Sequence, residues 1–280
     1  MIKRRFATID LGQIHYWTAG EDKRDGGRQP IVLLHASPYS ARTLNVLTEA
    51  MGRSRWAIAP DHLGQGDSAR PRISNPTIEY FGDALIQLLD ALGVAKVDVY
   101  GTQTGGHLAM DVSIRHPQRI RKVILDGSGP MPEAVRDAYV AQVRKKPPFE
   151  YSGSQTMWAF QAAKDMYMFF PYYERDSAHR RVRDLGTAQE LHLRALELLR
   201  NHDTYSDAYV AAFYANPGGS KYAKLRHPIL HTVGELDGSA AVFDQVAKMI
   251  PNCTARRYPP GVLAGDYAAV ADMFTEWLDS

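Results

Sequence analysis

The sequence lacks the features that mark secreted, membrane-spanning or nucleic-acid-binding proteins. It has 1 cysteine in 280 residues, so no internal disulfide can form, and Cys253 is interpreted as a packed thiol. No run of about eighteen apolar residues occurs, and none follows the basic start, so neither a membrane span nor a signal peptide is expected. The 33 Lys+Arg and 31 Asp+Glu leave a net charge of +2 without a basic stripe, which argues against nucleic acid. We therefore expect a cytoplasmic protein that contacts neither membrane nor nucleic acid.

A nucleophile is missing from the stretch whose pattern requires one. Residues 97–110 read V-D-V-Y-G-T-Q-T-G-G-H-L-A-M, which is a β-rich run, a glycine-flanked turn and a helix start. This is the pattern of a nucleophile elbow, in which the centre of G-x-S-x-G points from a strained turn into a pocket. The centre of this turn is Gln103, whose amide donates and accepts hydrogen bonds but does not attack a carbonyl.

Apolar runs that alternate with helical periodicity predict an α/β fold. Residues 6–18 alternate apolar and polar side chains, as a hairpin of half-exposed strands does. Continuous apolar runs, typical of strands buried on both faces, lie at residues 31–34, 56–60, 97–100, 122–125, 228–233 and 254–258. Helical spacing occurs at residues 41–51, 77–92, 105–116, 240–249 and 267–278. This βαβ rhythm predicts a mostly parallel sheet with helices on both faces.

The rhythm stops after residue 127 and resumes near residue 226. The intervening segment has helical periodicity and many aromatic residues, so we predict a helical cap over residues 129–225 and an α/β core of residues 1–128 and 226–280. Trp158, Phe170 and Tyr173 are predicted to line an apolar or aromatic ligand site beneath this cap. The alternative is that these aromatic side chains only pack the cap onto the core.

Four motifs at the ends of predicted strands resemble those of the α/β-hydrolase superfamily. They are the H-A-S-P loop at residues 35–38, the D-x-x-G-x-G-x-S turn at 61–68, the elbow at 101–105, and the acid-bearing G-x-x-D at 234–237. The resemblance covers nearly the whole chain. It implies an eight-stranded α/β-hydrolase fold with a cap inserted after the sixth strand.

The resemblance also implies an oxyanion site. The backbone amides of Thr104 and of Ser37 or Ala36 are expected to converge on one point, where they could stabilise an enolate or alkoxide. Gln103 would hold a substrate oxygen beside them, desolvated under the aromatic cap, and Asp237 takes the position of the triad acid or serves only as a turn residue. The expected substrate contacts are His35, Ala36, Tyr39, Trp158, Phe170, Tyr173 and Val262.

The histidine that follows the eighth strand in this superfamily is absent. Residues 258–266 read Y-P-P-G-V-L-A-G-D, and no histidine follows His231. Asp126, at the end of the sixth strand, is a second position for the acid, or it caps the loop. The sequence does not choose among the other candidate bases, which are His35, His62, His107, His192, His202, Asp165 and Glu174.

Without a nucleophile, the site favours elimination, isomerisation, cyclisation or decarboxylation over acyl transfer. The expected substrate is small and apolar or aromatic, and no cofactor or metal is implied. Two alternatives stay open: a catalytically silent protein of this fold that binds a ligand, and an atypical hydrolase whose elbow residue was altered. A homodimer is also left open.

Overall fold

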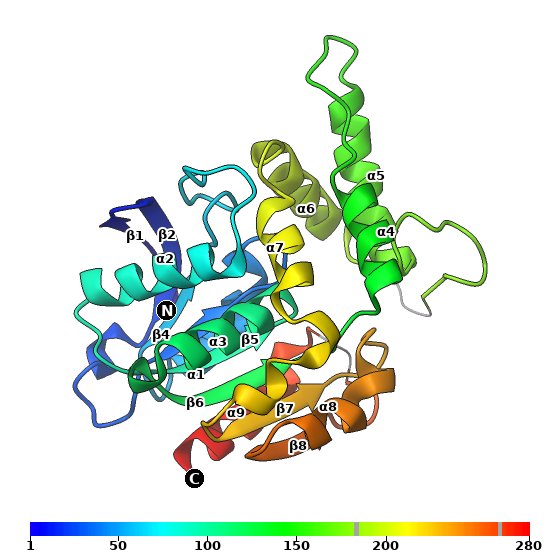
Figure 1. Ribbon diagram of the computed structural model, residues 1–280. Helices are drawn as coiled ribbons and strands as arrows, with labels where there is room; N and C mark the ends of the chain where they lie inside the picture. Colours follow the sequence, from blue (N-terminus) through cyan, green and yellow to red (C-terminus); the bar gives the residue numbers. More distant parts are fainter. Residues whose placement is uncertain (182–184, 263–264) are drawn as a thin grey trace.

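The computed structural model describes residues 1–181, 185–262 and 265–280. One 8-stranded sheet in the order β1-β2-β4-β3-β5-β6-β7-β8 forms its centre (Figure 1). Among the strand pairs of this sheet in the described residues, only β1–β2 and β2–β4 are antiparallel, which confirms the predicted mostly parallel sheet. The strands are β1 (Lys3–Ile9), β2 (Gly12–Ala19), β3 (Ile31–Leu34), β4 (Ala57–Pro60), β5 (Val97–Thr102), β6 (Ile120–Asp126), β7 (Ile229–Val233) and β8 (Cys253–Arg257).

Helices cover both faces of the sheet. Helices α1 (Asn45–Met51) and α9 (Tyr267–Asp279) pack on one face, and α2 (Ile78–Ala91), α3 (Thr104–Arg115) and α8 (Phe243–Met249) pack on the other. Strand β3 shows how the sequence specifies both contacts. Its four residues are all buried, with Ile31 and Leu33 in the first core layer and Val32 and Leu34 in the second, because successive side chains of a strand point to opposite faces.

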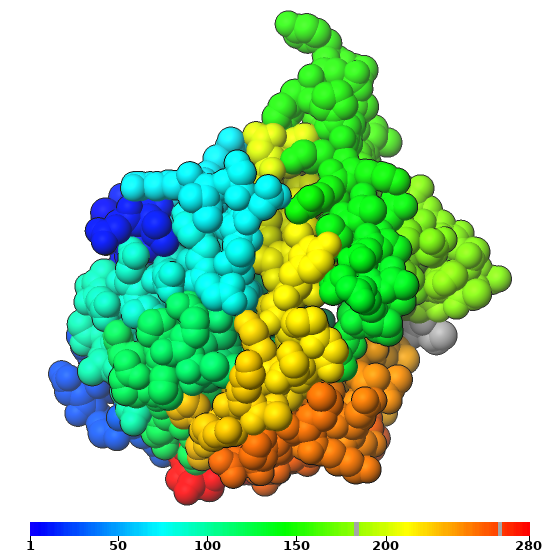
Figure 2. All heavy atoms as spheres, viewed as in Figure 1, coloured from blue at the N-terminus to red at the C-terminus, as the bar shows by residue number. Residues whose placement is uncertain are grey.

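The described part of the chain between β6 and β7 is mainly helical. It contains α4 (Glu133–Val143), α5 (Ser154–Met168), α6 (Ala188–Arg200) and α7 (Asp207–Ala215), and none of its described residues joins the main sheet. Figure 2 shows the green region around the start of α5 projecting beyond the rest of the molecule. Helix α7 differs from the others, since its Ala208, Ala211 and Ala215 pack into the core on the α2 and α3 side. The division into core and cap therefore stays a prediction.

Short 3₁₀ turns complete the backbone. They are η1 (Glu21–Lys23), η2 (Ala41–Leu44), η3 (Pro117–Arg119), η4 (Pro217–Gly219), η5 (Tyr222–Lys224) and η6 (Ala240–Val242). Among the helices of the described ranges, none is both long and apolar enough to cross a membrane.

Candidate functional site

The predicted strained turn is present between β5 and α3. Gln103 has φ 50° and ψ −111°, a left-handed backbone conformation that is unfavourable for a residue with a side chain. The flanking glycines make the turn feasible. A β-carbon on Gly101 would lie 2.2 Å from the carbonyl oxygen of Gly105, and one on Gly105 would lie 2.1 Å from that of Leu34. The elbow can therefore pack closely against β3 because Gly101 and Gly105 have no side chains.

The side chain of Gln103 bonds to Asp237. Its Nε2 donates to Asp237 Oδ2 at 3.1 Å and lies 3.4 Å from Oδ1. Asp237 Oδ1 also accepts bonds from the amide of Ser239 at 2.8 Å and from its hydroxyl at 2.6 Å. In a serine triad this carboxylate orients a histidine. In this chain the Gln103 amide takes that hydrogen bond.

Gly127 supplies the floor of the Gln103–Asp237 pair. It has φ 61°, and a β-carbon on it would lie 2.8 Å from both Asp237 Oδ2 and Gln103 Nε2. Any side chain at this position would therefore displace the pair. The sequence contains a signal for this contact, because Gly127 follows directly after Asp126 at the end of a buried strand, but this position lies outside the four motifs.

The pair is open to solvent. Gln103 is exposed and Asp237 is half-buried, so the expectation of a desolvated amide beneath the cap is wrong. The physical reason is that the cap aromatics pack on one another. The ring of Tyr139 lies within 6.2 Å, centroid to centroid, of five other aromatic rings, those of Phe170, Tyr172, Tyr173, Tyr209 and Phe213.

Three of the predicted contact residues lie at different places in the structure. Phe170 is next to the pair, because a β-carbon on Gly238 would lie 3.5 Å from its ring. Val262, in the stretch where the superfamily has its histidine, accepts a bond at its carbonyl from the amide of Glu235 at 3.2 Å. Trp158 instead packs against His202 and Tyr205 inside the cap. Residues 263 and 264, which follow Val262, lie outside the described residues.

The loop after β3 is held by contacts of its own. The amide of Ser37 donates to Thr104 Oγ1 at 3.3 Å, so one of the two expected oxyanion donors already has a partner. The hydroxyl of Ser37 bonds to the side chain of Gln65. Tyr39 is buried and its hydroxyl donates to Met166 Sδ at 3.1 Å. The oxyanion role of Ser37 and Thr104 stays a prediction.

The rings of His35 and His62 are buried and stacked on each other, which does not suit either of them to act as a base. Their ring centroids are 4.0 Å apart. The amide of His62 donates to His35 Nε2 at 3.1 Å, and His62 Nε2 donates to the carbonyl of His35 at 3.0 Å. Burial holds the pKa of His35 well below its usual range and lowers that of His62 to about 4. Both rings are therefore neutral at pH 7, and the predicted contact of the His35 ring with a substrate is wrong because His35 has no exposed surface.

No side chain of the other candidate bases is hydrogen-bonded to the Gln103 side chain, whose bonds within the described residues go to Asp237. Burial lowers the pKa of His107 to about 4. His202 Nε2 bonds to the carbonyl of Pro147 at 2.9 Å. Asp165 is buried and pairs with Arg175 at 2.8 Å. His192 and Glu174 are exposed on the cap segment.

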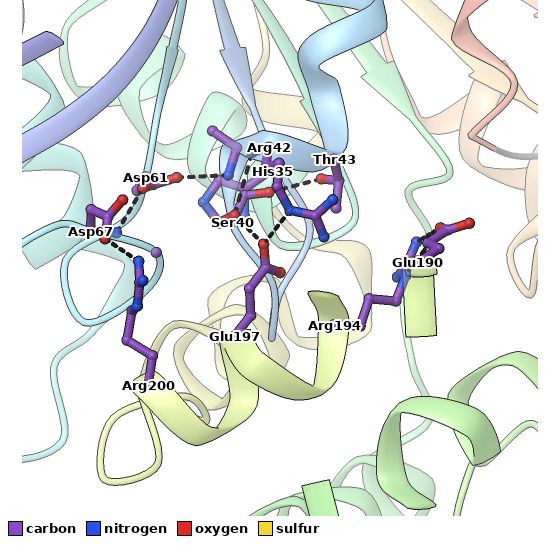
Figure 3. A network of polar contacts seen from close by, with 12 residues as sticks. His35, Ser40, Arg42, Thr43, Asp61, Asp67, Glu190, Arg194, Glu197 and Arg200 are labelled. Carbon is purple, nitrogen blue, oxygen red and sulfur yellow. Dashed lines mark hydrogen bonds and ion pairs between the residues drawn. The ribbon is translucent and has the colours of Figure 1, made fainter. Parts of the chain in front are cut away.

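Polar contacts join the loops of the core to α6 (Figure 3). Glu197 Oε1 accepts bonds from Ser40 Oγ at 2.6 Å and from Arg42 Nε at 2.9 Å. Arg200 pairs with Asp67, in the turn after β4. These contacts fix α6 over the loop that carries Ser37, so the cap segment and the predicted oxyanion loop are positioned together.

Asp126 lies behind the elbow, where three hydroxyl groups donate to its carboxyl group. Tyr100 and Tyr258 donate to Oδ2 at 2.6 and 2.7 Å, and Thr232 donates to Oδ1 at 3.0 Å. Burial raises the pKa of Asp126 to about 6, and the charge of Asp237 acts in the same direction. Asp126 is therefore a buried side chain within a hydroxyl cluster and does not simply cap the loop.

This raised pKa predicts a pH-dependent stability. The native state holds the Asp126 proton more tightly than the unfolded state does, so stability is lost as the pH rises from about 4 through 6. We expect the free energy of unfolding of the wild type to fall by about 2 to 3 kcal/mol more than that of Asp126→Asn between pH 4 and pH 7.5. Urea unfolding at both pH values measures the difference. Asp90→Asn, at an exposed position, is the control and should follow the wild type. Parallel pH profiles for wild type and Asp126→Asn would contradict the prediction.

Comparison with known proteins identifies the family. A family model described as alpha/beta hydrolase fold matches residues 29–261. The chain belongs to this family. It is 35% identical over 106 residues to a 2-hydroxymuconate semialdehyde hydrolase of Pseudomonas sp. (strain CF600), a match that covers 37% of this chain and 38% of that protein. It is also 28% identical over 130 residues to a cis-3-alkyl-4-alkyloxetan-2-one decarboxylase of Shewanella oneidensis, covering 45% of this chain and 39% of the relative. The chain thus spans well under half the length of each of these relatives.

Solved structures confirm the fold over the whole chain. An enol-lactonase from Burkholderia xenovorans LB400 superimposes with a TM-score of 0.73 at 19% identity, and the match covers 98% of both chains. The epoxide hydrolase CorEH gives a TM-score of 0.73 at 17% identity, over 100% of this chain and 99% of the other. At these identities the likeness establishes the fold alone.

Proposed function

We propose that the protein is an enzyme of nucleophile-free chemistry in which Asp237 is the general base and Gln103 binds a substrate oxygen. The observation that supports this most directly is the hydrogen bond between Gln103 Nε2 and Asp237 at the strained elbow. Among the described residues, Asp237 is the one titratable side chain that contacts Gln103. Strain of this kind is retained where the surrounding structure enforces it, and it concentrates at functional sites.

The geometry supports a proton transfer. Asp237 Oδ1 is occupied by two donors from Ser239, whereas Oδ2 accepts only from Gln103 among the described residues. Oδ2 can therefore take a proton from an acidic C–H or O–H group of a bound substrate. When a C–H bond next to a carbonyl is broken, its electron pair moves onto the carbonyl oxygen; when an O–H bond is broken, the pair stays on its own oxygen. The second hydrogen of Gln103 Nε2 can donate to that oxygen as its negative charge develops.

A small carbonyl compound with an apolar or aromatic body fits this scheme. The names of the two relatives include a semialdehyde and an oxetan-2-one, each of which carries a carbonyl group. The candidate reactions are elimination, isomerisation, cyclisation and decarboxylation. All of them pass through developing negative charge on oxygen or on an adjacent carbon.

The alternative is a catalytically silent protein that binds a ligand at the same place. One observation favours it: His35 and His62 are buried and bonded to each other, so these two histidines of the strand-end motifs are not available as bases. The two functions differ in one respect that can be measured, because only the first predicts a product.

Substitution of Gln103 distinguishes the enzyme from the binding protein. We expect Gln103→Ala to lower kcat by about 100-fold with a smaller change in KM, since the lost hydrogen bond strengthens as charge develops. Product analysis by mass spectrometry against a panel of dienoates, β-lactones and aromatic ketones, followed by kinetics on the compound that is converted, measures this. Gln118→Ala, at an exposed position in η3, is the matched control and should behave as the wild type.

Two results would count against a nucleophile-free enzyme. Ligand binding that Gln103→Ala weakens, with no product from any compound, would favour the binding protein. Stoichiometric labelling of the elbow by a fluorophosphonate probe would show that a nucleophile is present after all.

A further inference from the structure

A small hairpin of the cap segment carries a cation close to the elbow. The amide of Phe170 donates to the carbonyl of His179 at 2.9 Å, and that of Arg181 donates to Met168 at 2.7 Å. An ion pair between Arg175 and the buried Asp165, at 2.8 Å, anchors the loop between them. The hairpin thus fixes Phe170 and Arg181 side by side, with the guanidinium carbon of Arg181 4.9 Å from the centroid of the Phe170 ring.

The hairpin reaches the turn that holds the proposed base. The Phe170 ring packs on Gly238, where a β-carbon would lie 3.5 Å from two of its atoms, and Gly238 follows Asp237 directly. The charge of Arg181 also acts on two neighbouring phenols. Burial raises the pKa of Tyr139 and of Tyr209, and the positive charge of Arg181 opposes both shifts. Arg181 therefore faces the aromatic cluster around Tyr139 as well as the Phe170 ring.

Arg181 is half-buried and has no carboxylate partner among the described residues. This distinguishes it from several arginines of the same segment, which pair with Glu133, Asp165, Glu190 or Asp67; these are Arg136, Arg175, Arg194 and Arg200. The end of the sheet beside it is acidic, since it carries Asp126 and Asp237. A cation that is held in place without a carboxylate partner among the described residues is suited to an anionic ligand.

We propose that Arg181 and Phe170 form an anion-binding subsite beside Asp237 that takes the carboxylate of an aromatic or conjugated carboxylic acid. The guanidinium binds the carboxylate through paired hydrogen bonds, and the ligand's planar body lies against the exposed part of the Phe170 ring. The other end of the ligand reaches Gln103 and must be neutral, because Asp126 and Asp237 repel a second negative charge. This inference rests on the proposed function, and it adds that the substrate is a carboxylic acid with a separate carbonyl group.

Benzoate and benzamide test the subsite without any turnover. The two probes have the same shape and differ in charge. We expect calorimetric titration to show tighter binding of benzoate than of benzamide to the wild-type protein, and we expect Arg181→Gln to weaken benzoate binding about ten-fold while leaving benzamide unchanged. Arg181→Lys should retain part of the preference. Arg180→Gln, at the exposed neighbouring position, is the matched control and should leave both affinities unchanged.

The proposal is overturned by equal binding of the two probes to the wild type, by no binding of benzoate, or by an unchanged benzoate affinity in Arg181→Gln. Its failure is distinguishable from failure of the proposed function. The preference for benzoate depends on Arg181 and should persist in Gln103→Ala. If Gln103→Ala leaves turnover unchanged while Arg181→Gln abolishes the preference, the subsite stands and the proposed role of Gln103 fails.

Discussion

Replacement of Asp237 by asparagine is expected to lower kcat by a factor of about 10² to 10⁴ with little change in stability. Asparagine has the size of aspartate, and its amide oxygen can still accept the bonds from Ser239 that hold the turn. Its amide group cannot accept a proton from the substrate. Steady-state kinetics on the compound that the wild type converts, together with thermal unfolding of the variant, measures both parts of this expectation.

A control of the same chemical type is available on the next helix. Asp244 is exposed on α8 and pairs with Arg257 at 3.0 Å, so Asp244→Asn removes a carboxylate near the site without touching the elbow. It should retain the activity of the wild type. If Asp237→Asn also retains activity within about two-fold, the base lies elsewhere, and the proposed role of Asp237 is wrong.

The fold could be predicted because its signals are local. Each buried strand is a short continuous apolar run, as in β3, and each helix between strands has its own periodicity. The motifs at the strand ends then fix the family and with it the order of strands in the sheet. The antiparallel hairpin at the start followed from alternation around Gly12, which pairs with Ile9 across the turn between β1 and β2.

The elbow could be predicted for the same reason, since the glycines and the strained residue lie within five positions of one another. The partner of Gln103 could not, because Asp237 is 134 residues away in the chain. The cap was predicted wrongly as a cover for Gln103. Aromatic composition indicates that rings are buried together, but it does not indicate whether they pack on a ligand or, as around Tyr139, on one another.

The turn after β4 shows how a motif glycine depends on a distant contact. Gly66 has φ 55°, and a β-carbon on it would lie 2.0 Å from Asp61 Oδ2. The Asp61 carboxylate is buried and cannot move aside easily. Oδ1 accepts from the amide of Ala41 at 2.7 Å, and Oδ2 accepts from the amide of Asp67 at 2.9 Å and contacts His15 Nδ1 at 2.7 Å. Through Ala41 this carboxylate fixes the segment that follows the predicted oxyanion loop.

Gly66→Ala is therefore expected to cost about 3 kcal/mol or more of unfolding free energy, because at least one charge-assisted hydrogen bond of Asp61 must break in addition to the strain of the left-handed backbone. Gly27→Ala separates these two contributions. Gly27 has φ 81° but no atom within 4 Å of its β-carbon position. Gly27→Ala should therefore lose only the unfolding free energy that backbone strain costs, about 1 to 2 kcal/mol. Urea unfolding of both variants measures the difference. Equal losses would mean that the Asp61 carboxylate moves without cost, and that it does not hold the loop in place.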